Sequence, residues 1–195
     1  LGGQIAVAEA ARNVVCVGGE PIAITNCLNF GNPQDPEIYW QFREAVTGIG
    51  EACRSLNTPV TGGNVSFYNE TGESAVYPTP VIGMVGLLEN IEQNTTMEFK
   101  AAGDFIVTLG ALNGNLGGSE YLRTIYDKIQ GPIPHLNMEL EMGVQELCLE
   151  AIKKGIIKSA HDLSDGGLAV NISESLVRSA PELGGKLDVS RKLRN

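Results

Sequence analysis

Two glycines followed by small polar residues, Gly62-Gly63-Asn64-Val65-Ser66, form the segment best suited to hold a charged ligand. Glycine tolerates positive φ and lets a ligand approach the main chain without a Cβ in the way. Successive N–H groups in such a turn can converge on an anion. Asn64 offers an uncharged oxygen for a hard cation, and Ser66 points to the same side of an extended chain. The pattern suits a magnesium–phosphate ligand, and a tight turn between two strands explains it equally well.

A second polar cluster contains His161, Asp162 and Asp165. Two aspartates three residues apart, with a histidine, could bind a metal or act as acid and base. The alternative is structural: Asp165 would cap a helix that begins near Gly167, and Asp162 would tie down the turn before it. A glycine-rich loop at 114–118 resembles an anion site before a helix, but an ordinary strand-to-helix connection explains it better.

Composition and charge exclude several classes of partner. The 195 residues carry a net charge of -9, with a pI of about 4.7, whereas nucleic acids and anionic membranes require a basic surface. We therefore expect no nucleic-acid and no membrane partner. No apolar run reaches membrane-spanning length, and no signal peptide opens the sequence. Four cysteines without a C-x-x-C pair indicate buried reduced thiols in a cytoplasmic protein.

The elements that must position the glycine segment are predicted from periodicity and from start and stop signals. We expect helix, strand, helix, strand and strand, at 4–15, 21–28, 35–56, 59–66 and 80–88, with a hairpin-like turn at 69–72. The strand at 59–66 should break at its two glycines. Asn26 and Asn29 should follow the preceding strand and are candidates for ligand contacts or, by spacing alone, for turn stabilisation.

A polar segment without a clean period, residues 89–100, predicts a domain boundary near Ile91, so that the domains span 1–90 and 91–195. The second unit should begin with a strand at 104–109. Two helices should follow, one capped by Ser119 and one with an apolar stripe at 140–151. Because the sequence begins with Leu1 and residues 190–195 complete no element, we expect a piece of a longer protein.

Four segments, in this order, resemble phosphoribosylformylglycinamidine synthase of the small, multi-subunit type: 2–13 (GGQIAVAEAARN), 24–33 (ITNCLNFGNP), 62–66 (GGNVS) and 161–168 (HDLSDGGL). That family belongs to the aminoimidazole ribonucleotide synthetase-like superfamily. The resemblance implies an α/β (α+β) fold. Residues 1–90 would be a two-layer A-type domain that lacks its first strands and pairs into a central barrel. Residues 91–195 would be a truncated α/β B-type domain.

The resemblance also implies an activity. The family is an ATP-dependent carbon–nitrogen ligase of purine biosynthesis, which converts formylglycinamide ribonucleotide, ATP and glutamine-derived ammonia to formylglycinamidine ribonucleotide, ADP and phosphate. The implied cofactors are ATP and Mg²⁺. The implied partners are the substrate, a glutaminase subunit and a small accessory subunit, with self-association through the A domain.

The family's site residues carry over by position. Asn26 and Gly63 would contact ATP, Asn64 would bind magnesium, and Ser66 would contact the substrate. The family often has an aspartate at the position of Asn26, so the asparagine keeps the acceptor oxygen but loses the charge. The family's catalytic histidines lie in the half that is absent here. No catalytic role therefore passes to His161, and these 195 residues alone should be inactive.

Two alternatives remain open. This half could be a structural nucleotide-binding or dimerisation module that performs no turnover. It could also come from a relative such as the aminoimidazole ribonucleotide synthetase or the selenophosphate synthetase. Those relatives share the ATP-dependent chemistry but lack the LNFGNP segment found at residues 28–33.

Overall fold

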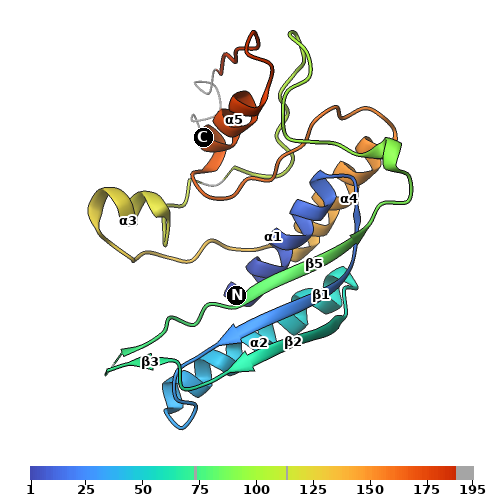
Figure 1. Ribbon diagram of the computed structural model, residues 1–195. Helices are drawn as coiled ribbons and strands as arrows, with labels where there is room; N and C mark the ends of the chain where they lie inside the picture. Colours follow the sequence, from blue (N-terminus) through green and yellow to red (C-terminus); the bar gives the residue numbers. More distant parts are fainter. Residues whose placement is uncertain (73, 113, 188–195) are drawn as a thin grey trace.

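The computed structural model describes residues 1–72, 74–112 and 114–187. The terminal residues 190–195, in which we expected no completed element, lie outside the described residues. A three-stranded sheet in the order β2-β1-β5 forms the centre of the first half (Figure 1). Strand β1 (Glu20–Asn29) runs parallel to β2 (Val60–Ser66) and antiparallel to β5 (Val81–Leu87). The sheet therefore leaves β2 at one edge and β5 at the other.

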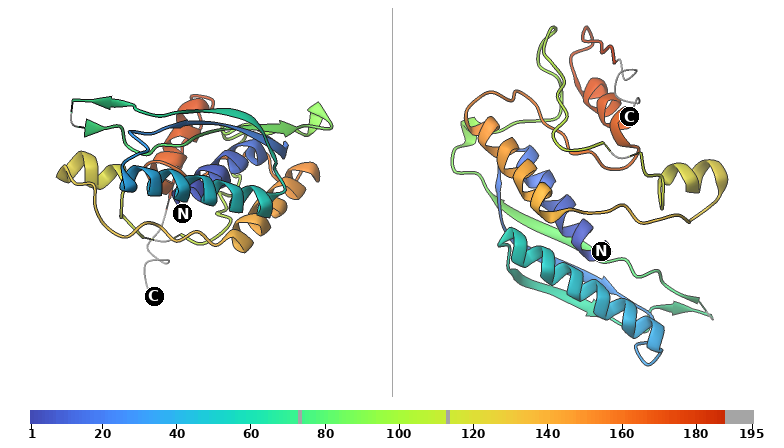
Figure 2. Two further views of the ribbon diagram at one scale, coloured as in Figure 1. Left: turned by 90° about the horizontal axis from the view of Figure 1, so that it is seen from below. Right: turned by 180° about the vertical axis from the view of Figure 1, so that it is seen from behind.

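Helices α1 (Gly2–Cys16) and α2 (Pro36–Leu56) cover one face of this sheet, which gives the expected two-layer arrangement (Figure 2). The apolar side chains of β1 that point toward the helices meet the inner stripes of α1 and α2. This core consists of Val7, Ile24, Leu28, Phe30, Ile49, Ala52 and Cys53. The mixed α/β class is confirmed, and so is the expected order of the two helices and the three strands of this sheet.

Helix α2 begins and ends where its capping residues predict. Asp35 accepts a hydrogen bond of 2.8 Å from the main-chain N–H of Glu37, and Pro36 occupies the first helical position. Asn57, in the left-handed conformation with φ of 54°, ends the helix. Pro59 then leads directly into β2, so these caps determine where the glycine segment lies.

A short hairpin follows β2, formed by β3 (Glu70–Thr71) and β4 (Ser74–Ala75). The predicted turn at 69–72 is therefore displaced toward its end, because Glu70 and Thr71 pair in β3 and the chain reverses from Gly72, whose φ is 64°. The 3-10 helix η1 (Ile91–Gln93) comes next.

The second half contains α3 (Glu120–Tyr126), α4 (Met138–Lys153) and α5 (Gly167–Arg178). Helix α4 packs beside α1, and both views show the two helices side by side (Figures 1 and 2). A small cluster of Val15, Cys148 and Ile152 joins them. Ser119 caps α3 as predicted, since its Oγ accepts a 3.3 Å hydrogen bond from the N–H of Leu122. No helix of the described residues has the length and apolarity needed to cross a bilayer.

Two predictions for the second half are wrong. Residues 104–109 form no strand, because no other described strand lies beside them to accept their main-chain hydrogen bonds. Phe105 and Val107 are instead 94% and 72% exposed. Asp165 does not cap α5: the capping position is Gly166, in the left-handed conformation, and no side chain caps the helix.

Candidate functional site

The pairing of β1 with β2 places Asn26 directly beside Gly63. The contact is so close that a Cβ at Gly63 would lie 2.4 Å from Oδ1 of Asn26 and 2.5 Å from its main-chain oxygen. Gly63 has a φ of 158°, at the limit of the region that favours glycine. Only a glycine therefore lets the Asn26 side chain lie across the β2 main chain at this point.

Two corrections to the sequence reasoning follow from this pairing. The strand does not break at Gly62 and Gly63, because the main chain of β2 remains paired with β1 through both glycines. Asn26 and Asn29 do not follow their strand but lie within β1, which ends at Asn29. Their side chains are therefore held by the sheet rather than by a turn.

Two threonines that the sequence reasoning missed fix the register at the site. Thr61 Oγ1 donates to the main-chain oxygen of Ile24, and Thr25 Oγ1 donates to the main-chain oxygen of Gly62. Each of these hydrogen bonds is 3.1 Å long. These bonds join β1 and β2 on either side of an irregularity, because Ile24 pairs with Val60 whereas Thr25 already pairs with Gly62. No sequence signal marks them, since threonine is common in any strand.

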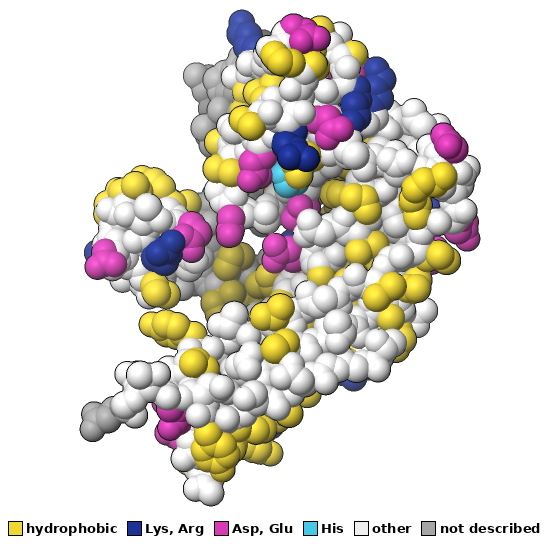
Figure 3. Space-filling model, in the orientation of Figure 1, with side chains coloured by type: hydrophobic (Ala, Val, Ile, Leu, Met, Phe, Trp, Pro, Cys, Tyr) yellow, Lys and Arg dark blue, Asp and Glu magenta, His cyan; other side chains and the backbone are white. Residues whose placement is uncertain are grey.

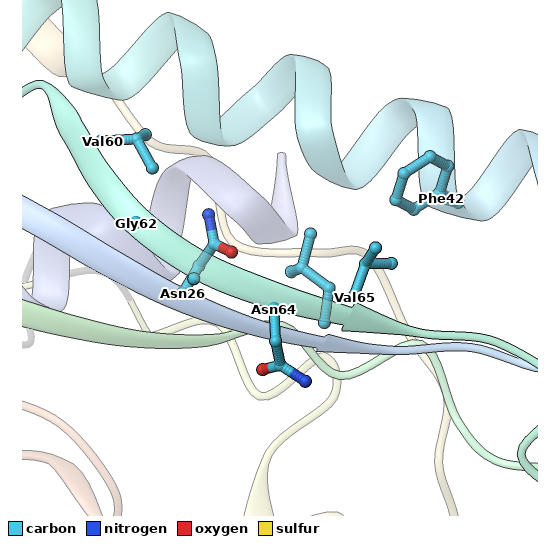
Figure 4. Close-up of a pocket in the computed structure, with 8 residues that line it drawn as sticks. Asn26, Phe42, Val60, Gly62, Asn64 and Val65 are labelled. Atoms are coloured by element: carbon cyan, nitrogen blue, oxygen red, sulfur yellow. The ribbon is translucent and has the colours of Figure 1, made fainter.

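A hollow of about 310 Å³ lies beside β2, between the strand and α2. It is lined by Asn26, Leu28, Phe42, Val60, Gly62, Gly63, Asn64 and Val65 (Figure 4). The structure thus brings together Asn26, Gly63 and Asn64, the predicted nucleotide and metal residues. Their side chains diverge, however: Asn26 points toward α2, and Asn64 points away from it (Figure 4). A ligand that touches both has to sit at the edge of the sheet.

Ser66, the predicted substrate contact, ends β2 and does not line the hollow. The amide of Asn69 holds this end of the strand. Its Nδ2 lies 2.9 Å from the main-chain oxygen of Ser66, 3.2 Å from Ser66 Oγ and 3.1 Å from the main-chain oxygen of Phe30. Asn69 therefore positions Ser66, whereas from the sequence we expected Asn69 only as part of a turn.

The face of the sheet opposite the helices carries little charge. Over the strands, Figure 3 shows hydrophobic side chains among uncharged atoms. Val81, Val85 and Leu87 of β5 are each more than half exposed. Asn64 and Ser66 therefore present their polar groups on a surface that adds little charge of its own.

The residues of the hollow fit a magnesium ion only in part. Magnesium in proteins usually keeps several waters and binds through one or two carboxylates together with substrate phosphates. Asn64 supplies a neutral amide oxygen, and the exposed residue is open to such a ligand. Among the described residues, no group of three or more His, Cys, Asp or Glu side chains could hold a metal ion. A metal at Asn64 would therefore depend on phosphate oxygens for most of its ligands.

His161 and Asp162 lie apart from this hollow and join the two halves of the chain. His161 Nδ1 lies 3.3 Å from Asp162 Oδ1, and Nε2 lies 3.1 Å from Glu174 Oε2 on α5. Asn13 of α1 donates a hydrogen bond of 3.5 Å to Asp162 Oδ2. Asn171 of α5 donates to the main-chain oxygen of Asp162. The Asp162 carboxylate thus contacts the side chains of His161 and Asn13, and only its main-chain oxygen is bonded to α5.

Two models of the AIR synthase related protein family match the helix-backed sheet and the unit that follows it. The chain belongs to this family: the AIR synthase related protein N-terminal domain matches residues 1–88, and the C-terminal domain matches residues 101–189.

Among curated proteins, the chain is 54% identical over 194 residues to the phosphoribosylformylglycinamidine synthase subunit PurL of Alkaliphilus metalliredigens. This match covers 100% of the chain and 26% of that relative, so the chain spans about a quarter of its length. The resemblance found in the sequence motifs is confirmed.

Solved structures show the same fold. Phosphoribosylformylglycinamidine synthase II from Thermotoga maritima superposes with a TM-score of 0.56 and 25% identity, over 89% of this chain and 25% of that one. HypE of E. coli, a hydrogenase maturation protein, superposes with a TM-score of 0.59 over 90% of this chain and 52% of that one. At 18% identity, the HypE match concerns the fold alone.

Proposed function

We propose that this chain is part of a PurL-type phosphoribosylformylglycinamidine synthase, a cytoplasmic ATP-dependent carbon–nitrogen ligase, and contributes one nucleotide site to it. The observation that carries the proposal is the contact between Asn26 and Gly63 at the exposed edge of β2. The identity of 54% to PurL supports the same reading. T. maritima PurL has been solved complexed with ATP and with FGAR, and we extend both ligand classes to this chain.

Each proposed role follows from the group that the residue presents. Among the described residues β2 pairs only with β1, so every second main-chain N–H of Val60–Ser66 faces the open edge, where it can donate to a phosphate. The Asn26 amide lies against Gly63 and would hold the nucleotide. Asn64 would bind the magnesium ion, which offsets charge on the transferred phosphoryl group when bound. Ser66, held by Asn69, would donate to the ribonucleotide substrate.

Substitutions at Asn64 and Ser66 in the full-length protein test the proposal. Asn64→Ala should raise the magnesium concentration that supports half-maximal ADP formation, and Ser66→Ala should raise the KM for formylglycinamide ribonucleotide by about 10-fold, the effect of one lost hydrogen bond to a charged or polar group. Thr47→Ala, on the exposed side of α2, is the control.

The same experiment separates the proposed role from the structural alternative. If both site variants turn over substrate like the control but lose nucleotide binding, this half is an auxiliary nucleotide-binding module. If neither binding nor turnover changes, the hollow beside β2 is not a ligand site.

We also propose that the chain associates through its sheet, with a glutaminase subunit and a small accessory subunit completing the enzyme. Both edges of the sheet, β2 and β5, lack a neighbouring strand among the described residues. Light scattering of the purified 195 residues should show dimers or larger species, and a monomer at high concentration would contradict the proposed association.

A further inference from the structure

Asn29, the last residue of β1, has no role in the site described so far, although it lies on the open face of the sheet, opposite the helices. Leu28 and Phe30, the residues before and after it, are 6% and 1% exposed and belong to the core beneath the helices. Because side chains alternate along an extended chain, the Asn29 side chain points to the other face.

Strand pairing places Asn29 beside Ser66, the residue to which the proposed function gives the substrate contact. In the parallel pair of β1 and β2, Asn29 lies opposite Ser66, and Cys27 lies opposite Asn64. Neighbouring strands are about 4.8 Å apart, so side chains that leave the same face at paired positions lie close together. Asn64 points away from α2 (Figure 4), and the four side chains therefore share the open face.

The Asn29 amide is half-buried but only weakly bonded within the protein. Its Nδ2 donates to Cys27 Sγ over a distance of 3.4 Å, and a thiol sulfur is a weak acceptor. This is the only hydrogen bond of the Asn29 side chain to the described parts of the chain, so Oδ1 is free to accept one from a ligand. A stronger partner would offset the cost of partly removing the amide from water.

The surroundings of Asn29 suit an uncharged part of a ligand. The three strands of the sheet contain no lysine or arginine, and Val81 of β5 lies beside Cys27 on the side away from β2. An amide both donates and accepts hydrogen bonds, which matches a hydroxyl or a second amide. Phosphate groups, in contrast, would be bound by the main-chain N–H groups at the edge of β2.

We propose that Asn29 is a further substrate-binding residue, whose amide pairs with an uncharged hydroxyl or amide group of the ribonucleotide next to Ser66. Cys27, which contacts Asn29, then lies under the bound substrate. The inference rests on the proposed function, because it extends the same site from β2 to β1.

Steady-state kinetics of the full-length protein test the role of Asn29. Asn29→Ala should raise the KM for formylglycinamide ribonucleotide by about 10-fold, the effect of one lost hydrogen bond, and leave kcat and the KM for ATP unchanged. Asn29→Asp keeps the shape and one oxygen but loses the N–H donors, so it should not restore the KM. Val85→Ala, on the same face of β5, is the control and should behave like the parent.

Ser66→Ala, measured in parallel, separates this inference from the proposed function. If Ser66→Ala raises the KM for the ribonucleotide and Asn29→Ala does not, the inference is overturned and the proposed function stands. If neither variant changes that KM, both are overturned. An Asn29→Ala protein that loses kcat and ATP affinity as well would show a structural role for Asn29, which also overturns the inference.

Alkylation of Cys27 provides a second test that needs no variant. The unsubstituted full-length protein is treated with iodoacetamide, with and without saturating formylglycinamide ribonucleotide, and digested with trypsin. The tryptic peptide 13–43 contains both Cys16 and Cys27, and fragmentation in the mass spectrometer assigns the label to one or the other. The ribonucleotide should slow alkylation of Cys27 at least several-fold and leave Cys16, at the end of α1, unaffected. Equal rates at Cys27 with and without the ribonucleotide would overturn the inference.

Discussion

Replacing Gly63 with alanine tests the contact on which the candidate site depends. The new Cβ would lie 2.4 Å from Oδ1 of Asn26 and 2.5 Å from its main-chain oxygen, whereas ordinary contacts begin near 3.4 Å. The side-chain oxygen can rotate away, but the main-chain oxygen belongs to β1 and can move only with the sheet. We expect the free energy of unfolding to fall by about 2 kcal/mol, the middle of the range for overpacking.

Gly62 offers a matched control one residue away. A Cβ at Gly62 would have no heavy atom within 4 Å, so Gly62→Ala should change stability by less than about 0.5 kcal/mol. Hydrogen exchange of the β1 and β2 amides in the full-length protein measures the local effect. A loss of 2 kcal/mol predicts exchange about 30-fold faster in Gly63→Ala than in the parent. Equal exchange in the two variants would refute the steric reasoning.

Three further outcomes follow from the contacts. Asp35→Ala should destabilise the protein by about 1 kcal/mol in urea unfolding, because α2 loses its cap. The pKa of Glu98 is lowered to about 2, mainly by the hydrogen bond from Lys100. The ionised Glu98 therefore stabilises the folded protein above its unfolded pKa, and this stabilisation disappears as the pH falls from about 4.5 to about 2. The thermal stability of Glu98→Gln should therefore depend less on pH across that window. Glu141→Ala should cost about 2 kcal/mol in urea unfolding, because it removes the 2.9 Å partner of the largely buried Arg12.

The elements with local signals could be predicted from the sequence. Helix α2 carries its cap, its proline and its apolar stripe within its own residues, so both ends were predicted correctly. Segment 104–109 shows the limit of such signals. It has the composition of a strand, but a strand needs a partner to accept its hydrogen bonds, and none of the described strands lies beside it.

The members of the candidate site could be named from the sequence, but their relative placement could not. The contact of Asn26 with Gly63 depends on the register between two strands separated by a helix, which no local pattern encodes. The family resemblance supplied the residues without the geometry. Asn69 was missed as a positioning residue because its role depends on reaching Phe30, which precedes α2 in the chain.

The irregularity between β1 and β2 gives the glycine segment its orientation. Ile24 pairs with Val60 and Thr25 with Gly62, so β2 has one extra residue, Thr61, opposite this step of β1. Side chains alternate along a strand, and one extra residue reverses the alternation beyond it. Val60 and Val65, five positions apart, consequently both line the hollow beneath α2 (Figure 4).

If Thr61 instead took a regular place in the pairing, Asn64 would point toward α2, where Phe42 and Leu28 offer no partner for its amide. The bulge instead turns Asn64, and with it Ser66 two positions on, to the face of the sheet that the helices leave open. A regular strand with the same residues would bury both polar groups under the helix layer. The orientation that makes a ligand site possible therefore comes from the bulge at Thr61, which Thr25 and Thr61 fix by hydrogen bonds to the opposite main chain.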